Sequence, residues 1–230
     1  QAQLLAGNLT LTATAGSIGG PGLNGSSYLK IDQSAGGVLN ASAVNGGVAL
    51  WETKGNMRIG SVVAGDGSLI DLKADADLVN TNGSATDLSA GFVRLVSENG
   101  RIGSTSDPLV IDVKAANGWV DGKAAGDIGL TEKDGDLRLQ SVVSLAGDVR
   151  LESLNGSIVD VNSAQQVDVE TKTQLLAAAQ RARLTATSGA TKSLDNTLDA
   201  YNTQKKQDYL QYWQMRGLKE TFDSSGKSLG

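Results

Sequence analysis

Apolar and polar residues alternate over short stretches of the first two thirds of the chain. Leu9, Leu11 and Ala13 show this period of two, and Leu137 and Leu139 show it again farther along. The alternation is typical of a β-strand with one buried face, because successive side chains of a strand point to opposite sides. We therefore predict short strands, and not helices, over this part of the chain.

Glycines divide these strands at fixed intervals. Five pairs of glycines stand nine residues apart, at Gly7/Gly16, Gly46/Gly55, Gly91/Gly100, Gly126/Gly135 and Gly147/Gly156. In two places a step of twelve follows the step of nine, which gives an elementary period of 21 residues. Strands this short cannot bury their apolar face alone, so neighbouring periods have to supply the other wall of the core. The period predicts a mainly β fold, a parallel β-helix whose coils pair with the coils above and below.

A longer match is superimposed on this period. Residues 46–63 match residues 126–143 at an offset of 80, so we expect two blocks of about 80 residues. Downstream, Ile70 matches Val149 at an offset of 79. An uncorrected slip of one residue would turn the apolar face outward. The change of offset therefore predicts a bulge or an altered corner near Gly65–Gly67.

Asn-Gly and Asp-Gly pairs, such as Asn45/Gly46 and Asp134/Gly135, stand where we expect the corners. Corners often need a positive φ, which glycine adopts freely and Asn or Asp adopt at little cost. The same pairs are typical of two-residue antiparallel hairpins, and this alternative stays open. The regular spacing favours stacked coils.

The pattern changes near Val169. Residues 174–183 are a run of strong helix formers. After Gly189, a stripe with helical spacing ends before Gly217 and comprises Leu194, Leu198, Tyr201, Lys205, Tyr209, Tyr212, Trp213 and Arg216. We predict a β-helix over residues 1–168, an α-helical segment over 169–217 that packs on or caps it, and a linker or the start of the next repeat over 218–230.

The composition of the chain argues against several classes of function. The net charge is −5 and the 20 Lys and Arg are scattered, so nucleic-acid binding lacks its electrostatic basis. Histidine and cysteine are absent, which removes the commonest general base, thiol catalysis and structural zinc. The apolar runs are only a few residues long, and we expect no membrane span. A start at Gln1, without initiator Met or signal peptide, indicates a piece of a longer protein.

Carboxylates are the remaining candidates for catalysis, as in sugar-cleaving enzymes. They form three groups: Asp71/Asp75/Asp77, Asp134/Asp136, and Asp148 with Glu152. Strand spacing would place Asp75 and Asp77 on one face. Most of these residues stand beside Gly or Asn at expected corners, where turn geometry alone favours Asp. We therefore expect no catalytic residues.

Two binding chemistries also have candidates. The stretch Gly65–Asp71 resembles, in one imperfect copy, the Gly- and Asp-rich nonapeptides that bind calcium between β-helix turns, so calcium at Asp corners stays open. Tyr209, Tyr212 and Trp213 offer a sugar-binding platform, although an apolar helix face more often packs on a core. We expect no cofactor and no metal site.

The recurrent units Gly16-Ser-Ile-Gly19, Gly100-Arg-Ile-Gly103, Gly126-Asp-Ile-Gly129 and Gly156-Ser-Ile-Val-Asp160 resemble the repeat region of filamentous-haemagglutinin-like large exoproteins of Gram-negative bacteria. The resemblance covers roughly residues 4–165 and rests on a pattern. It implies a right-handed parallel β-helix that is exported to the cell surface and serves as a stalk, adhesin or filament. The helical segment departs from a plain repeat of this family.

We therefore expect a non-catalytic structural module of a large secreted or cell-surface fibrous protein. Its expected partners are neighbouring copies of the repeat, which would assemble into a fibre, or surface glycans and receptors of host or neighbouring cells. Its expected location is extracellular, at the bacterial surface. The alternative is a carbohydrate-binding or carbohydrate-cleaving β-helix, and a third hypothesis is a carrier for a toxin domain beyond Gly230.

Overall fold

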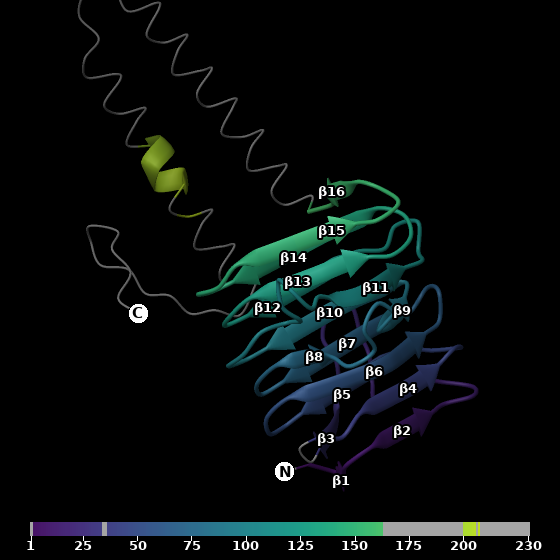
Figure 1. The fold of residues 1–230 in the computed structure, drawn as a ribbon. Coiled ribbons are helices and arrows are strands. Elements are labelled where there is room, and N and C mark those ends of the chain that lie inside the picture. Colours follow the sequence, from purple (N-terminus) through teal and green to yellow (C-terminus); the bar gives the residue numbers. More distant parts are fainter. Residues whose placement is uncertain (1, 34–35, 163–199, 206, 208–230) are drawn as a thin grey trace, which may run out of the picture. The chain divides into compact units, whose positions relative to one another are not determined.

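The computed structural model describes residues 2–33, 36–162, 200–205 and 207 (Figure 1). It divides the chain into two units, Gln1–Asn162 and Ser163–Gly230. The described residues of the first unit form a stack of β-strands. In chain order these strands are β1 Leu4–Ala6, β2 Leu9–Thr12, β3 Leu29–Gln33, β4 Leu39–Ala43, β5 Val48–Glu52, β6 Met57–Ala64, β7 Leu69–Ala74, β8 Leu78–Asn80, β9 Leu88–Ala90, β10 Phe92–Ser97, β11 Leu109–Val113, β12 Val120–Ala124, β13 Ile128–Glu132, β14 Leu137–Ser144, β15 Val149–Ser153 and β16 Ile158–Asp160.

The strands belong to two sheets, which we call the first and the second sheet. The first sheet has the order β1-β3-β5-β7-β10-β12-β14-β16, and the second has the order β2-β4-β6-β9-β11-β13-β15, with β8 beside β6. The chain moves from one sheet to the other and back in every winding (Figure 1). All pairings between these strands are parallel. The described residues of the first unit therefore form a parallel β-solenoid, and the hairpin alternative is wrong for its strands.

The pairing confirms the period of 21 residues. Leu29 lies beside Leu50 and Leu137 lies beside Ile158, each a step of 21. Where the step is longer, as between β2 and β4, the additional residues form loops at the corners. Loops can be inserted there without disturbing the register, because the strands on either side still face the same core.

Inward side chains of both sheets form one core along the stack. Leu50, Ile59 and Leu72 have no exposed surface, and neither has Leu137. Leu139 is partly buried and packs against the same cluster. The alternation in the sequence therefore marks the buried face correctly. This apolar column is the main source of stability, at about 1.5–3 kcal/mol for each large side chain buried.

The 80-residue match does not relate whole windings. Its two copies contain β5 followed by β6, and β13 followed by β14. β5 and β14 belong to the first sheet, whereas β6 and β13 belong to the second. The repeated unit is thus a strand, a corner and a strand, and it fits either sheet because both inward faces meet the same core.

The slip to 79 residues has the predicted cause. Val62 and Leu72 both face the core and stand ten residues apart, whereas Val142 and Leu151 stand nine apart. Between inward side chains, the path from β6 to β7 therefore holds one more residue than the path from β14 to β15, although each corner has four residues between the strand bounds. The Ser68 N–H closes the first corner on the Gly65 carbonyl at 2.8 Å. The altered corner keeps the apolar face inward.

In the second unit the structure describes a short helix over 200–205, within the predicted helical segment. The Lys205 ammonium lies 5.9 Å from the centre of the Tyr201 ring, as expected for residues four apart on a helix. Apart from residue 207, the other residues of 163–217, including the proposed sugar platform, lie outside the described residues, and so do 218–230. Packing or capping by this segment stays a prediction. Among the helices of the described residues, none is long and apolar enough to cross a membrane.

Candidate functional site

Corner side chains hold successive windings together. The Asp127 carboxylate accepts a hydrogen bond from the Asp148 backbone N–H at 2.9 Å, and the Asp136 carboxylate accepts one from the Ser157 N–H at 2.8 Å. Each acceptor lies 21 residues before its donor, one winding away. This ladder explains the recurrent Gly-Asp/Asn-apolar unit, because the Asp or Asn binds the next winding while the apolar residue enters the core.

Glycines permit this close stacking, and for most of them the predicted reason was wrong. Among the ten glycines of the nine-residue pairs, only Gly55 and Gly135 have a positive φ, of 85° and 88°. A Cβ on Gly46 would instead meet the backbone of Gly16, and one on Gly156 would meet that of Gly135. These corners need glycine because successive windings touch there.

The predicted pairing of Asp75 and Asp77 on one strand face is also wrong. β7 ends at Ala74, and both residues lie in the corner that follows. The Asp75 carboxylate accepts hydrogen bonds from the Gly55 N–H at 3.3 Å and the Asn99 side-chain amide at 3.2 Å. The Asp77 carboxylate accepts one from the Arg101 N–H at 3.0 Å. Both serve the stacking of windings.

The other candidate acids are also dispersed. Asp134 and Asp148 are exposed at corners. The Glu152 carboxylate accepts a hydrogen bond from the Arg150 guanidinium at 2.7 Å on the outside of β15. Asp71, which ends the calcium-like stretch, lies within β7 and contacts Arg94. In the part of the chain that the structure describes, no three acids are placed to hold a metal ion.

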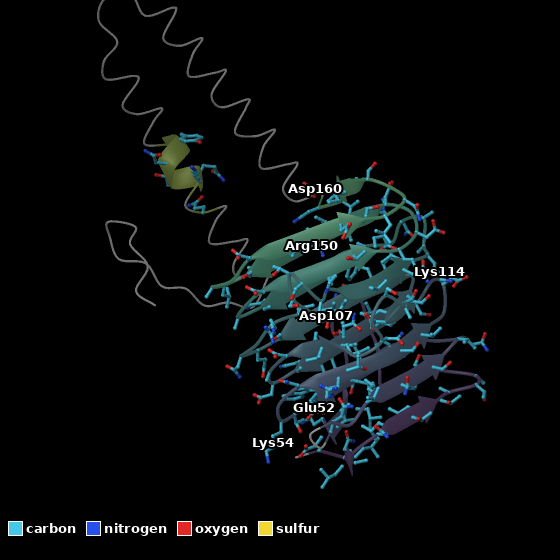
Figure 2. The ribbon with its side chains drawn as sticks, viewed as in Figure 1. Glu52, Lys54, Asp107, Lys114, Arg150 and Asp160 are labelled. Atoms are coloured by element: carbon cyan, nitrogen blue, oxygen red, sulfur yellow. The ribbon has the colours of Figure 1, made fainter. Side chains whose placement is uncertain are left out.

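Buried carboxyl groups that the sequence analysis missed lie at strand ends. Glu52 and Glu132 stand 80 residues apart and have no exposed surface. Each accepts a backbone N–H from the preceding winding, Glu52 from Gln33 at 2.8 Å and Glu132 from Val113 at 3.2 Å. Burial raises the pKa of the Glu52 carboxyl, and it raises that of Glu132 to about 7. Figure 2 shows Glu52 with Lys54, whose N–H it also accepts, at one corner of the stack. Both residues occupy the same position in the 80-residue match, and this repetition could have identified them from the sequence.

Asp87, directly before β9, is a third fully buried carboxyl group. One of its oxygens accepts the Val110 N–H at 2.8 Å, and the other has no hydrogen-bond partner among the residues that the structure describes. Burial, opposed by that hydrogen bond and reinforced by the nearby charge of Asp107, raises its pKa to about 7. Asp87 has no exposed surface, and we expect its raised pKa to affect the stability of the fold.

All four aromatic residues of the first unit lie on one outer face. Tyr28, Trp51, Phe92 and Trp119 stand on or beside strands of the first sheet and alternate with its inward residues. The corresponding face of the second sheet carries mainly small polar residues such as Thr10, Asn40, Ser42 and Ser89. The two sheets share one core, so folding alone does not require this difference.

Trp51 stands at the centre of a row of cations. Lys30 and Lys73 are its partners on the neighbouring strands, and their ammonium groups lie 4.9 and 4.3 Å from the centre of its ring. Lys73 also forms an ion pair with Glu98 at 2.6 Å. Tyr28 approaches Trp51 edge-on, with the ring centres 6.4 Å apart. These contacts form a ladder across three windings.

Asp71 is the centre of a second row on this face. Its side chain is fully buried and accepts hydrogen bonds from the Ser26 hydroxyl at 2.6 Å, the Tyr28 hydroxyl at 3.0 Å and the Arg94 guanidinium at 3.1 Å. Arg94 also lies 3.7 Å from the Asp121 carboxylate and 5.4 Å from the centre of the Trp119 ring. Burial and the charge of Asp71 together raise the pKa of the Tyr28 phenol. This face gathers hydroxyl-binding and carbonyl-binding groups beside aromatic rings.

A comparison with family models, with curated proteins and with solved structures finds no match for this chain. The resemblance to filamentous-haemagglutinin-like exoproteins therefore stays a prediction that rests on the sequence pattern.

Proposed function

We propose that this chain is a non-catalytic structural module of a large secreted or cell-surface fibrous protein. The observation that carries the proposal is the corner ladder, in which each winding offers hydrogen-bond acceptors to the next. Asp127 and Asp136 accept N–H groups one winding ahead, and parallel strands extend the same pattern in both sheets. Such a stack is extended by adding windings, as a stalk or filament requires.

The use of the acidic residues supports a structural role. Asp75 and Asp77 bind the neighbouring windings, and Asp71 binds a loop and Arg94. A carboxylate pair for sugar cleavage needs two acids facing one substrate, with one of them free to transfer a proton. The contacts of these three residues explain them without a substrate.

Exposure on intact cells tests this function. Antibodies against residues 1–162 are applied to cells that make the parent protein, before and after treatment with an external protease. We expect labelling of intact cells and its loss after the protease. Labelling that requires lysis, and that the external protease leaves unchanged, would contradict a surface module.

A second candidate function is carbohydrate binding by the outer face of the first sheet. The confinement of Trp51, Trp119 and their aromatic neighbours to this face favours it, because aromatic rings beside hydroxyl-binding groups suit saccharides. A glycan array with the whole chain tests this candidate. We expect saturable binding that Trp51→Ala weakens and that Leu154→Ala, on an exposed corner, preserves; equal binding by both variants would refute it.

A further inference from the structure

The loop between β2 and β3 contains a segment, residues 21–26, that we call the strap. It lies against the outer face of the first sheet, far along the stack from its own winding. The Arg94 guanidinium, on β10, donates hydrogen bonds to the Gly22 carbonyl at 3.3 Å and the Leu23 carbonyl at 2.8 Å. Ser26 donates its hydroxyl hydrogen to Asp71 on β7. The strap therefore crosses from the second winding over β5 and β7 to β10.

Polar contacts hold the strap in place. No residue from 19 to 28 belongs to the apolar core, and Leu23 is 53% exposed. Pro21 packs over Gly47 at one end of the strap. The base is closed by Gly20 and Ser27, which exchange two backbone hydrogen bonds of 2.7 and 2.8 Å. Lifting residues 21–26 thus exposes little apolar surface and leaves this base intact, which makes it a low-cost local opening.

The strap contacts Asp71 and Arg94, two members of a row of charged groups with aromatic residues on both sides. Asp71, Arg94 and Asp121 are register partners on three successive strands of the first sheet. The row of Trp51 and the lysines lies two residues after the charged row, because Lys73, the partner of Trp51, follows Asp71 by two. The row of Trp119 lies two residues before it, because Trp119 precedes Asp121 by two. We call the charged row between the aromatic rows the trough.

The contacts show what the trough recognises. Its carboxylate binds the hydroxyl of Ser26, and its guanidinium binds two carbonyl oxygens. The hydroxyls of a saccharide can fill both roles, because they donate to a carboxylate and their oxygens accept from a guanidinium. The trough carries both signs of charge, in Asp71, Arg94 and Asp121, and Lys73 beside it is paired with Glu98. This balance fits a neutral ligand better than an acidic one.

We propose that the strap is an internal occupant of a saccharide-binding trough, and that its displacement opens the trough to neutral, hydroxyl-rich glycans. The inference rests on the second candidate function, carbohydrate binding by this face. It adds that the strap competes with the ligand for Asp71 and Arg94. The apparent affinity for a ligand is then the affinity of the open trough multiplied by the fraction of chains in which the strap is open.

Removing the strap tests this competition. Residues 21–26 are replaced by Asn-Gly in the whole chain, because Gly20 and Ser27 already face each other as the ends of a hairpin. Binding is measured on an array of neutral and acidic glycans and then by titration. We expect at least tenfold tighter binding of a neutral glycan than by the unaltered chain. Arg94→Ala in the strapless chain should abolish that gain.

Ser26→Ala provides a second test that keeps the strap length. It removes one hydroxyl from Asp71 and should speed amide hydrogen exchange in residues 21–26, with a smaller gain in glycan affinity. If the strapless chain does not fold, as judged by circular dichroism, this variant decides the question. Faster exchange without tighter glycan binding would overturn the proposal.

Two outcomes separate this proposal from the candidate function on which it rests. Glycan binding that Trp51→Ala abolishes, but that strap removal leaves unchanged, would keep the carbohydrate-binding face and overturn the strap as its occupant. A folded strapless chain that binds no glycan, or prefers acidic ones, would overturn the proposed ligand class.

Discussion

Replacing the buried carboxyl group of Asp87 should change how stability depends on pH. The folded protein raises the pKa of Asp87 from 3.8 to about 7, chiefly because the side chain is buried. An acid with a raised pKa holds its proton more tightly in the folded state than in the unfolded state. Its contribution to stability is therefore fully present below pH 4, decreases between pH 4 and pH 7, and is constant above that.

The size of the effect follows from the two pKa values. Each pKa unit corresponds to about 1.4 kcal/mol. Most of the difference between 3.8 and 7 is crossed between pH 5 and pH 8, so the wild-type free energy of unfolding should decrease by about 2–3 kcal/mol over this interval through Asp87 alone. Asp87→Asn cannot ionise and should remove this part of the decrease. Its amide oxygen can still accept the Val110 N–H.

Urea unfolding at pH 5 and pH 8, followed by tryptophan fluorescence, measures the difference. Asp66→Asn, at an exposed corner, is the matched control and should retain the wild-type decrease. Glu132 contributes a decrease of the same sign, since its pKa is also raised to about 7, so Asp87→Asn should reduce the pH dependence and not abolish it. An Asp87→Asn chain with the full wild-type decrease would refute the assignment.

Three further substitutions test packing, each by its effect on the free energy of unfolding. Gly46→Ala would push a Cβ into the backbone of the preceding winding and should cost about 1–3 kcal/mol, whereas Gly67→Ala, with open space around it, should have little effect. Gly55→Ala also has space, but its φ of 85° should cost about 1–2 kcal/mol, and an unchanged urea midpoint would show that the corner relaxes. Leu50→Ala opens a cavity in the core and should cost about 2–5 kcal/mol, while Leu5→Ala, at a 77% exposed position, should stay within about 0.5 kcal/mol; similar losses for the two would contradict the assigned core.

The period of the sequence was sufficient to predict the stacked strands and the residues of the core. Leu137 and Leu139 repeat at intervals of two because one face of a strand is buried, and this is a local property. The altered corner near Gly65–Gly67 was predictable for the same reason, since a change of face would turn the apolar side chains away from the core. In each case one physical requirement acts on neighbouring residues.

Contacts between distant windings were not predictable in this way. The bonds from Arg94 to the strap join residues more than 70 positions apart, and they depend on the register of four strands. The Asp87 carboxylate accepts the N–H of Val110, which lies 23 positions farther along the chain. Asp75 and Asp77 were misplaced because spacing alone does not show that β7 ends at Ala74.

The sequence also does not indicate to which of the two sheets a strand belongs. β5 and β13 have matching sequences yet lie in opposite sheets, because both sheets present the same inward face. The sequence specifies a strand and a corner, but β8 and β9 both pair with β6 in the second sheet, so the strands after them lie on the side opposite to the one that strict alternation would give.

A pair of engineered cysteines tests the central claim, the parallel stacking of windings 21 residues apart. The chain has no cysteine of its own, and Ser42 is the register partner of Val63 on the neighbouring strand. Parallel partners lie about 4.8 Å apart, within disulfide range, whereas Ser42 and Ser61 are separated by an additional two residues, at about 8 Å. We predict that the Ser42→Cys/Val63→Cys chain forms an intramolecular disulfide on mild oxidation and that the Ser42→Cys/Ser61→Cys chain does not. Ready oxidation of the second pair, or failure of the first, would contradict the stacked solenoid.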